Sequence, residues 1–238
     1  MNHCARSLLA EFPDILLAIG HSDEYSFILR KEACLWNRRA SKLQSSFASS
    51  FSSLFVFHWS KFFPTQELTY PPMFDARTVL YPSAQNVRDY LSWRQVDCHI
   101  NNLYNTCFWN LVLHKSMTES EAHKRLSATN SSEKNEILYR EFKINYNNLP
   151  LVFRKGTVLI RHAPMINVTN HKTGEETTRQ SKKKITIEWN QDVITDLQFW
   201  LLYCQELMLP SEINNDATLR TQSSSSSSTT TTTTPSSS

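Results

Sequence analysis

Two adjacent carboxylates, Asp23 and Glu24, stand between two short apolar segments near the start of the chain, directly after His21 and Ser22. Carboxylates at a turn between apolar strands suit Mg²⁺, a hard cation that binds one or two carboxylates together with phosphate oxygens. Because successive side chains of a strand point to opposite faces, we expect only one metal ligand from this pair. Ser, Asp and Glu are also common turn residues, so a plain polar turn fits these positions as well.

Basic residues elsewhere could contact phosphate. The chain has only three glycines, too few for a glycine-rich phosphate loop, so phosphate binding would depend on metal and cations. Arg38 and Lys42 lie four residues apart, on one face of an expected helix, and suggest a triphosphate contact. Lys155, with Arg154, stands at the expected start of a strand and is a second candidate. Solvated surface charge is the alternative for each of them.

A long helix expected over residues 84–115 carries His99 and Asn102, which lie one helical step apart. Together they could reach a nucleotide or a tRNA phosphate. A buried, hydrogen-bonded histidine explains the same residues equally well. Trp93 and Arg94 in this helix could stack on a base, but packing is the commoner role of a tryptophan in a long helix.

The pattern along the chain predicts an α+β fold. We expect a hairpin with strands at 15–20 and 25–29, further strands at 78–81, 154–161 and 184–189, and a mobile loop at 170–183. Helices are expected at about 37–61, 84–115, 132–143 and 192–208, with another that begins at a capping box of Thr118 and Glu121.

Composition limits the remaining possibilities. The 238 residues are 40% apolar with a net charge of +3, contain no run of about 18 apolar residues and do not begin with a secretory signal. We therefore expect no membrane association and a location inside the cell, in cytoplasm, nucleus or mitochondrion. The five cysteines are scattered without a C-x-x-C pair, which disfavours disulfides and zinc. Residues 211–238, rich in Ser and Thr, are expected to be disordered.

Four sequence strings occur in the order found in one enzyme family. They are GHSDEYSF at 20–27, YLSWRQ with DCHINNLYNT at 90–106, KNEIL with INYNN at 134–148, and RKGTVL at 154–159. Over residues 1 to about 162 the chain resembles the tRNA-histidine guanylyltransferases, and a looser likeness returns at 192–200.

The resemblance implies a palm-like sheet of the polymerase and cyclase type in a domain at 1–83, then a mainly helical domain at 84–210. It implies that ATP activates the 5′-monophosphate of tRNA-histidine and that the 3′-hydroxyl of GTP displaces the activating group, with Mg²⁺. Asp23 and Glu24 match the catalytic carboxylates, with Asp23 on the metal. The nucleotide contacts match Ser22, Asp23, Arg38, Lys42, His99, Asn102 and Lys155. Family members form tetramers, so a homo-oligomer is expected.

One family motif is absent from the sequence. The family's first strand carries an Arg-Ile-Asp-Gly motif whose aspartate and glycine carbonyl bind both metals, and no such string occurs in these 238 residues. We therefore expect an incomplete palm and impaired activity. The alternative function is a non-catalytic homologue that binds tRNA or forms oligomers. A general nucleotide cyclase or polymerase would not need the helix that contains residues 97–106.

Overall fold

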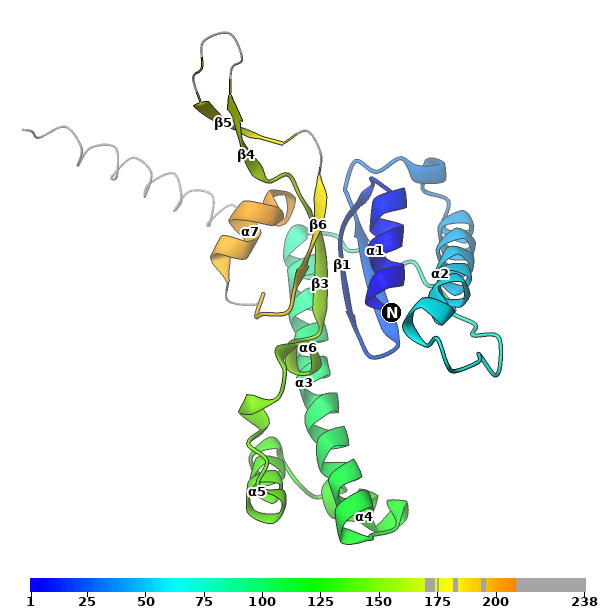
Figure 1. Cartoon of the computed structure of the whole chain (residues 1–238), viewed down its shortest axis with the longest axis vertical. Helices are drawn as coiled ribbons and strands as arrows, with labels where there is room; N and C mark the ends of the chain where they lie inside the picture. The colour runs from blue at the N-terminus through cyan, green and yellow to red at the C-terminus, as the bar shows by residue number, and fades with distance from the viewer. Residues whose placement is uncertain (170–173, 175, 182–183, 194–195, 209–238) are drawn as a thin grey trace, which may run out of the picture.

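A computed structural model describes residues 1–169, 174, 176–181, 184–193 and 196–208. The chain combines helices with antiparallel sheet, which confirms the expected α+β class. Its main sheet has four strands in the order β2-β1-β3-β6 (Figure 1). The strands are β1 (Ile15–His21), β2 (Glu24–Leu29), β3 (Thr157–His162) and β6 (Ile185–Trp189).

Strand β1 lies inside the sheet because its residues are apolar on both faces. Positions 15–20 are all buried, and the strand pairs antiparallel with β2 on one side and β3 on the other. Ala18 faces the cluster that contains α1 residues, whereas Leu17 and Ile19 face the cluster that contains α3 and α7 residues. The expected hairpin is confirmed, and its strands extend to His21 and from Glu24.

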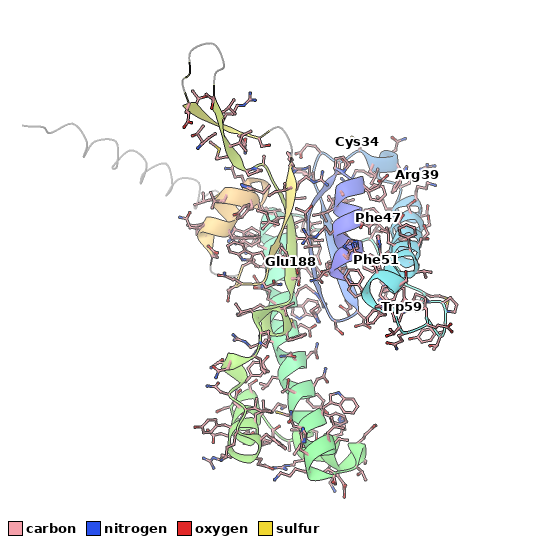
Figure 2. The ribbon with its side chains drawn as sticks, in the orientation of Figure 1. Cys34, Arg39, Phe47, Phe51, Trp59 and Glu188 are labelled. Carbon is pink, nitrogen blue, oxygen red and sulfur yellow. The ribbon has the colours of Figure 1, made fainter. Side chains whose placement is uncertain are left out.

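Helices α1 (Asn2–Glu11) and α2 (Ala40–Phe62) cover one face of this sheet (Figure 1). Leu8 and Leu9 of α1 are fully buried against it, and aromatic rings fill the space toward α2. Phe51 is buried there and lies on α2, as does Phe47 (Figure 2). The ring of Phe47 stacks on Phe12 with centroids 5.2 Å apart.

The long helix α3 (Ala84–Lys115) has the bounds that the sequence predicts. Ser83 caps it by accepting a hydrogen bond from the backbone of Asn86, and Ser116 ends it in a left-handed conformation. The amino-terminal half of α3 packs on the second sheet face with α7 (Leu197–Tyr203).

The carboxyl-terminal half of α3 extends past the sheet and builds a helical lobe with α4 (Glu119–Ser127) and α5 (Ser131–Phe142) (Figure 1). This lobe has its own core, which includes Leu103 and Leu138. The capping box of Thr118 and Glu121 is confirmed, and α5 begins and ends one residue before the expected bounds.

Several other expectations are wrong. Residues 78–81 form no strand, and Val79 and Leu80 are exposed. Part of the expected mobile loop is strand β5 (Glu176–Gln180), which pairs with an unexpected strand β4 (Met165–Thr169). The last expected helix is shorter, because it consists of α7 and one turn at Gln205–Leu207.

The start of β3 also differs from the prediction. Residues 154 and 155, expected in a strand, end the short helix α6 (Leu151–Lys155), which begins after Pro150. The left-handed Gly156 then turns the chain into β3.

The main sheet contains strands from both sides of the expected domain division at residues 83 and 84. Strands β1 and β2 precede the division, whereas β3, which pairs with β1, and β6, which pairs with β3, follow it. The division itself stays a prediction. The expected disordered tail at 211–238 lies outside the described residues. No helix in the described part of the chain is long and apolar enough to cross a membrane.

Candidate functional site

The tip of the β1–β2 hairpin is a two-residue turn made of Ser22 and Asp23. His21 and Glu24 pair across the strands immediately before it. Ser22 has a φ of +54°, a conformation that costs a non-glycine residue about 1–3 kcal/mol and persists only where the surroundings enforce it. The contacts around the turn therefore decide where its carboxylates lie.

Arg94 of α3 supplies those contacts. Its side chain is only 7% exposed, and its Nη2 atom donates to the Glu24 carboxylate and lies 2.7 Å from Nε2 of His21. Its Nη1 atom donates to Oδ2 of Asp97, one turn further along α3, at 3.3 Å. One buried guanidinium thus joins both ends of the turn to the helix.

The same contacts determine the protonation of His21. Nε2 of His21 lies 2.7 Å from Nη2 of Arg94 and 3.4 Å from Oδ2 of Asp97, so it accepts from Arg94 when unprotonated and donates to Asp97 when protonated. Burial, and then the charge of Arg94, lower the pKa of His21, while Asp97 and Glu24 oppose this shift. The lowered pKa favours the neutral imidazole of His21.

Asp23 and Glu24 have different environments despite their adjacency. The Glu24 carboxylate is paired with Arg94, whereas Asp23 is exposed and its carboxylate has no hydrogen bond or ion pair within the described part of the chain. Asp23 thus fits as one ligand of a Mg²⁺ ion whose other ligands are phosphate oxygens and water. Among the described residues, no group of three or more His, Cys, Asp or Glu side chains could hold a metal ion.

Close backbone packing fixes the base of the hairpin. The ring of Tyr25 covers Gly20, and a Cβ atom at Gly20 would lie 2.6 Å from that ring. A Cβ atom at Gly156 would lie 2.8 Å from the carbonyl oxygen of Gly20. The two glycines therefore let the hairpin approach both its own tyrosine and the loop that leads into β3.

A second group of predicted residues lies on α3 and α6. The side-chain amide of Asn102 donates to the hydroxyl of Tyr146, and that hydroxyl donates to the backbone oxygen of His99. Burial, followed by the charges of Lys155 and Arg154, lowers the pKa of His99. His99 and Lys155 are thus brought together, while Asn102 holds Tyr146.

Lys155 already has a partner, because its Nζ atom lies 2.9 Å from Oδ2 of Asp192. The buried Gln95 of α3 holds both segments in place. Its amide donates to the backbone oxygens of Lys155 and Gln191, and its oxygen accepts from the backbone of Val193.

The predicted pairing of Arg38 with Lys42 on one helical face is wrong. Arg38 lies before α2, in a turn where Trp36, Asn37 and Arg38 all have left-handed φ values between 48° and 55°. Its guanidinium donates to the backbone oxygens of Lys31 and Ala33, so it closes the loop after β2. Lys42 is exposed in the first turn of α2.

Sequence reasoning missed Arg94 and Asp97 as members of the site. Arg94 is three residues after the buried Leu91 and four before the buried Cys98, so an arginine occupies the apolar face of α3. That position was the available signal, because a charged residue on a buried helical face needs a partner.

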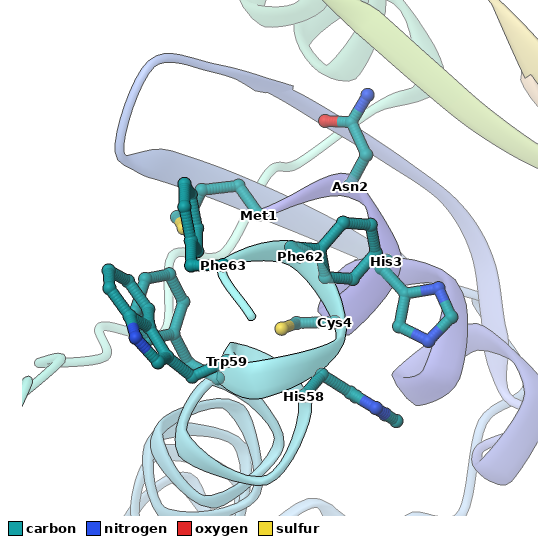
Figure 3. Close-up of a pocket in the computed structure, with 9 residues that line it drawn as sticks. Met1, Asn2, His3, Cys4, His58, Trp59, Phe62 and Phe63 are labelled. Atoms are coloured by element: carbon teal, nitrogen blue, oxygen red, sulfur yellow. The ribbon is translucent and has the colours of Figure 1, made fainter. Parts of the chain in front are cut away.

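A separate apolar pocket lies between the start of α1 and the end of α2 (Figure 3). None of the predicted site residues lines it. The rings of Trp59 and Phe63 stack on one side of it, and Phe62 lies on the other side beside His3 (Figure 3). The ring centroids of His3 and His58 are 4.3 Å apart.

Two family models match the chain. The model described as tRNAHis guanylyltransferase covers residues 1–82, and the model described as Thg1 C terminal domain covers residues 85–198.

Curated relatives include the probable tRNA(His) guanylyltransferase of Dictyostelium discoideum, which is 50% identical over 85% of this chain and 77% of that protein. The tRNA(His) guanylyltransferase of Debaryomyces hansenii is 47% identical over 84% of this chain and 77% of its own length.

Solved structures agree with these relatives. The crystal structure of tRNA(His) guanylyltransferase from Saccharomyces cerevisiae is 42% identical and superposes with a TM-score of 0.65, over 83% of this chain and 77% of that one. A bacterial tRNA(His) guanylyltransferase-like protein in complex with ATP is 19% identical, with a TM-score of 0.57 over 87% of this chain and 77% of its own, and supports the fold alone.

Proposed function

The chain belongs to the tRNA-histidine guanylyltransferase family, and we propose that it adds a guanine nucleotide to the 5′ end of tRNA-histidine. In this proposal ATP activates the tRNA 5′-monophosphate, and the 3′-hydroxyl of GTP displaces the activating group. The observation that carries it is the exposed Asp23 carboxylate at the tip of a fixed hairpin. This hairpin lies within the part of the chain that matches the guanylyltransferase model.

The protein's own contribution is to hold the reacting phosphates in position. Phosphoryl transfer asks for little covalent chemistry from protein groups, so positioning and neutralisation of charge account for most of the catalysis. A bound Mg²⁺ would neutralise phosphate charge. Asp23 offers it one carboxylate, and the neighbouring Ser22 offers a hydroxyl to the nucleotide. Glu24 is bound to Arg94, so we assign it to the support of the turn.

His99 and Lys155 form a second candidate contact with phosphate. Lys155 is half-buried and paired with Asp192, so a substrate phosphate would compete with that carboxylate for the ammonium group. Lys42 is exposed on the surface, where its ammonium group can contact phosphate. The guanidinium of Arg38 instead donates hydrogen bonds to backbone oxygens. We retain Lys155, His99 and Lys42 as proposed contacts.

We further propose that the sheet is a palm of the polymerase and cyclase type. An antiparallel sheet with helices on both faces and a carboxylate at a hairpin tip supports this assignment. We also propose that the chain forms a homo-oligomer, which light scattering would detect, and that it acts inside the cell, where tRNA occurs.

The test is transfer of labelled guanine nucleotide to tRNA-histidine in the presence of ATP and Mg²⁺. We expect Asp23→Asn to lower the transfer rate by at least about 100-fold, since it removes the proposed metal ligand. Asp75→Asn is the matched control, because Asp75 is an exposed aspartate paired only with the exposed Arg77 among the described contacts. Equal rates for the two variants would contradict the role of Asp23.

The expected impairment and the non-catalytic alternative are tested with the same preparation. If activity is impaired, the wild-type chain should transfer the nucleotide slowly, and Asp23→Asn should lower this rate further. A non-catalytic homologue would bind tRNA-histidine in a filter assay without any transfer. Absence of transfer, of tRNA binding and of any oligomer or co-purifying partner subunit would contradict the proposed function and its alternative.

A further inference from the structure

We infer that Arg94 is a positioning residue, which directs the Asp23 carboxylate outward by joining the two ends of its turn. This inference rests on the proposed function, in which Asp23 binds a metal ion. It goes further because it assigns the orientation of that ligand to a buried side chain on another element. In this inference Arg94 acts through Asp23 and is not itself a ligand.

The first step of the argument is the conformation of the turn. A left-handed serine between two strand ends is unfavourable by itself, and such residues persist where neighbouring contacts enforce them. His21 and Glu24, which flank the turn, both contact Nη2 of Arg94. The guanidinium therefore connects the strand that enters the turn to the strand that leaves it.

The second step is the anchoring of Arg94. Its side chain is 7% exposed, and Asp97 fixes its other terminal nitrogen from the same helix. The guanidinium also lies 5.1 Å from the ring centroid of Trp93, measured from Cζ. A planar group held at both terminal nitrogens cannot turn freely, so it transmits the position of α3 to the hairpin.

The third step is the choice between two adjacent carboxylates. Arg94 neutralises Glu24, which is 63% exposed and would otherwise compete with Asp23 for a cation. Asp23 then remains as the carboxylate that faces solvent without a partner among the described residues. Supporting residues that orient a metal ligand typically change metal affinity about 10–100-fold when they are replaced.

The test uses Mn²⁺ with GTP as the probe and measures bound Mn²⁺ by electron paramagnetic resonance, so it does not depend on turnover. We expect Arg94→Lys to weaken Mn²⁺–GTP binding by about ten-fold or more, because lysine cannot contact both flanks and Asp97 at once. Arg125→Lys is the matched control, since Arg125 also pairs with a carboxylate, Glu141, but lies in the helical lobe.

The effect of Arg94→Lys on Mn²⁺–GTP affinity, measured in the Asp23→Asn variant, separates a positioning role from a purely structural one. There we expect Arg94→Lys to cause no further loss of affinity, because the residue acts through Asp23. An equal loss in both backgrounds would overturn the inference. If Arg94→Lys does not fold, Glu24→Gln takes its place, because it removes one of the two flank contacts at an exposed site and should weaken binding in the same Asp23-dependent way.

The outcomes also distinguish this inference from the proposed function. Weak binding by Asp23→Asn with normal binding by Arg94→Lys would refute the positioning role and leave the metal ligand in place. Normal binding by Asp23→Asn, or no binding by the wild-type chain, would refute the metal site and the inference together.

Discussion

The ammonium nitrogen of Lys155 lies 2.9 Å from Oδ2 of Asp192, so the end of α6 is tied to the segment that follows β6. The charge of the same lysine also acts on His99, whose pKa it lowers together with Arg154, after the larger effect of burial. One lysine thus links a surface ion pair to the protonation of a histidine on α3.

We predict that Lys155→Met raises the pKa of His99, because removal of a nearby positive charge favours the imidazolium form. The pKa should stay below its ordinary value, since burial, the largest cause, is unchanged. Histidine side-chain NMR over a pH series measures it. Lys134→Met is the control, because Lys134 lies on α5 and bonds to Thr129. An unchanged or lower pKa in Lys155→Met would contradict the assigned cause.

Gly156→Ala should lower the free energy of unfolding by about 2 kcal/mol. The residue has a φ of +72°, and the added Cβ would lie 2.8 Å from a backbone oxygen of Gly20. Gly174→Ala is the matched control, since Gly174 has a φ of +73° and no atom of the described residues lies within 4 Å of the added Cβ. Urea denaturation compares the two, and an equal loss would show that close packing at Gly156 contributes nothing.

Gln95→Leu should lower the free energy of unfolding by about 2–4 kcal/mol, because it leaves buried backbone groups without partners. Gln95 is 2% exposed and makes three hydrogen bonds to the backbone of two separate segments. Gln85→Leu, at an exposed position earlier in α3, should change it by no more than about 0.5 kcal/mol. Similar losses for both variants in urea would argue against this role of Gln95.

One thiol should react rapidly with a disulfide reagent in the native protein. Cys34 is exposed, whereas the other four cysteines are buried. Burial raises the pKa of Cys98 and Cys107 to about 11 and that of Cys204 to about 12, so little reactive thiolate is present at pH 8. A Cys34→Ser variant should lose the fast phase of the spectrophotometric assay. A fast phase that survives this substitution would mean that a buried thiol is accessible.

Long periodic elements and capped ends could be predicted from the sequence. The bounds of α3 follow from Ser83 after a proline and from a helical pattern that continues to residue 115. The β1–β2 hairpin follows from two apolar runs around four polar residues. In both cases the determining residues are close together in the chain.

The failures depend on contacts between distant segments or on unusual backbone conformations. Three consecutive left-handed residues that include Trp36 and Arg38 have no glycine to indicate them, so the helix start was placed too early. For Arg94 the sequence suggested only stacking on a base together with Trp93, because its actual partners, His21 and Glu24, lie about 70 positions earlier. Strand alternation predicted one ligand from the pair and the family resemblance indicated Asp23, but the pairing of Glu24 with Arg94, which explains the choice, required the structure.

The single helix α3 sets the distance and the rotation between the hairpin tip and the helical lobe. At about 1.5 Å per residue, the part of the helix from Arg94, which contacts the hairpin, to Lys115 at its end spans about 32 Å. One residue inserted between Cys98 and Leu103 would turn the lobe by about 100° around the helix axis. Seven inserted residues would move the lobe further from the hairpin tip but nearly restore its original rotation. The binding of a substrate that contacts the hairpin tip and the lobe at once would therefore depend on the length of α3 and on the rotation of the lobe around its axis.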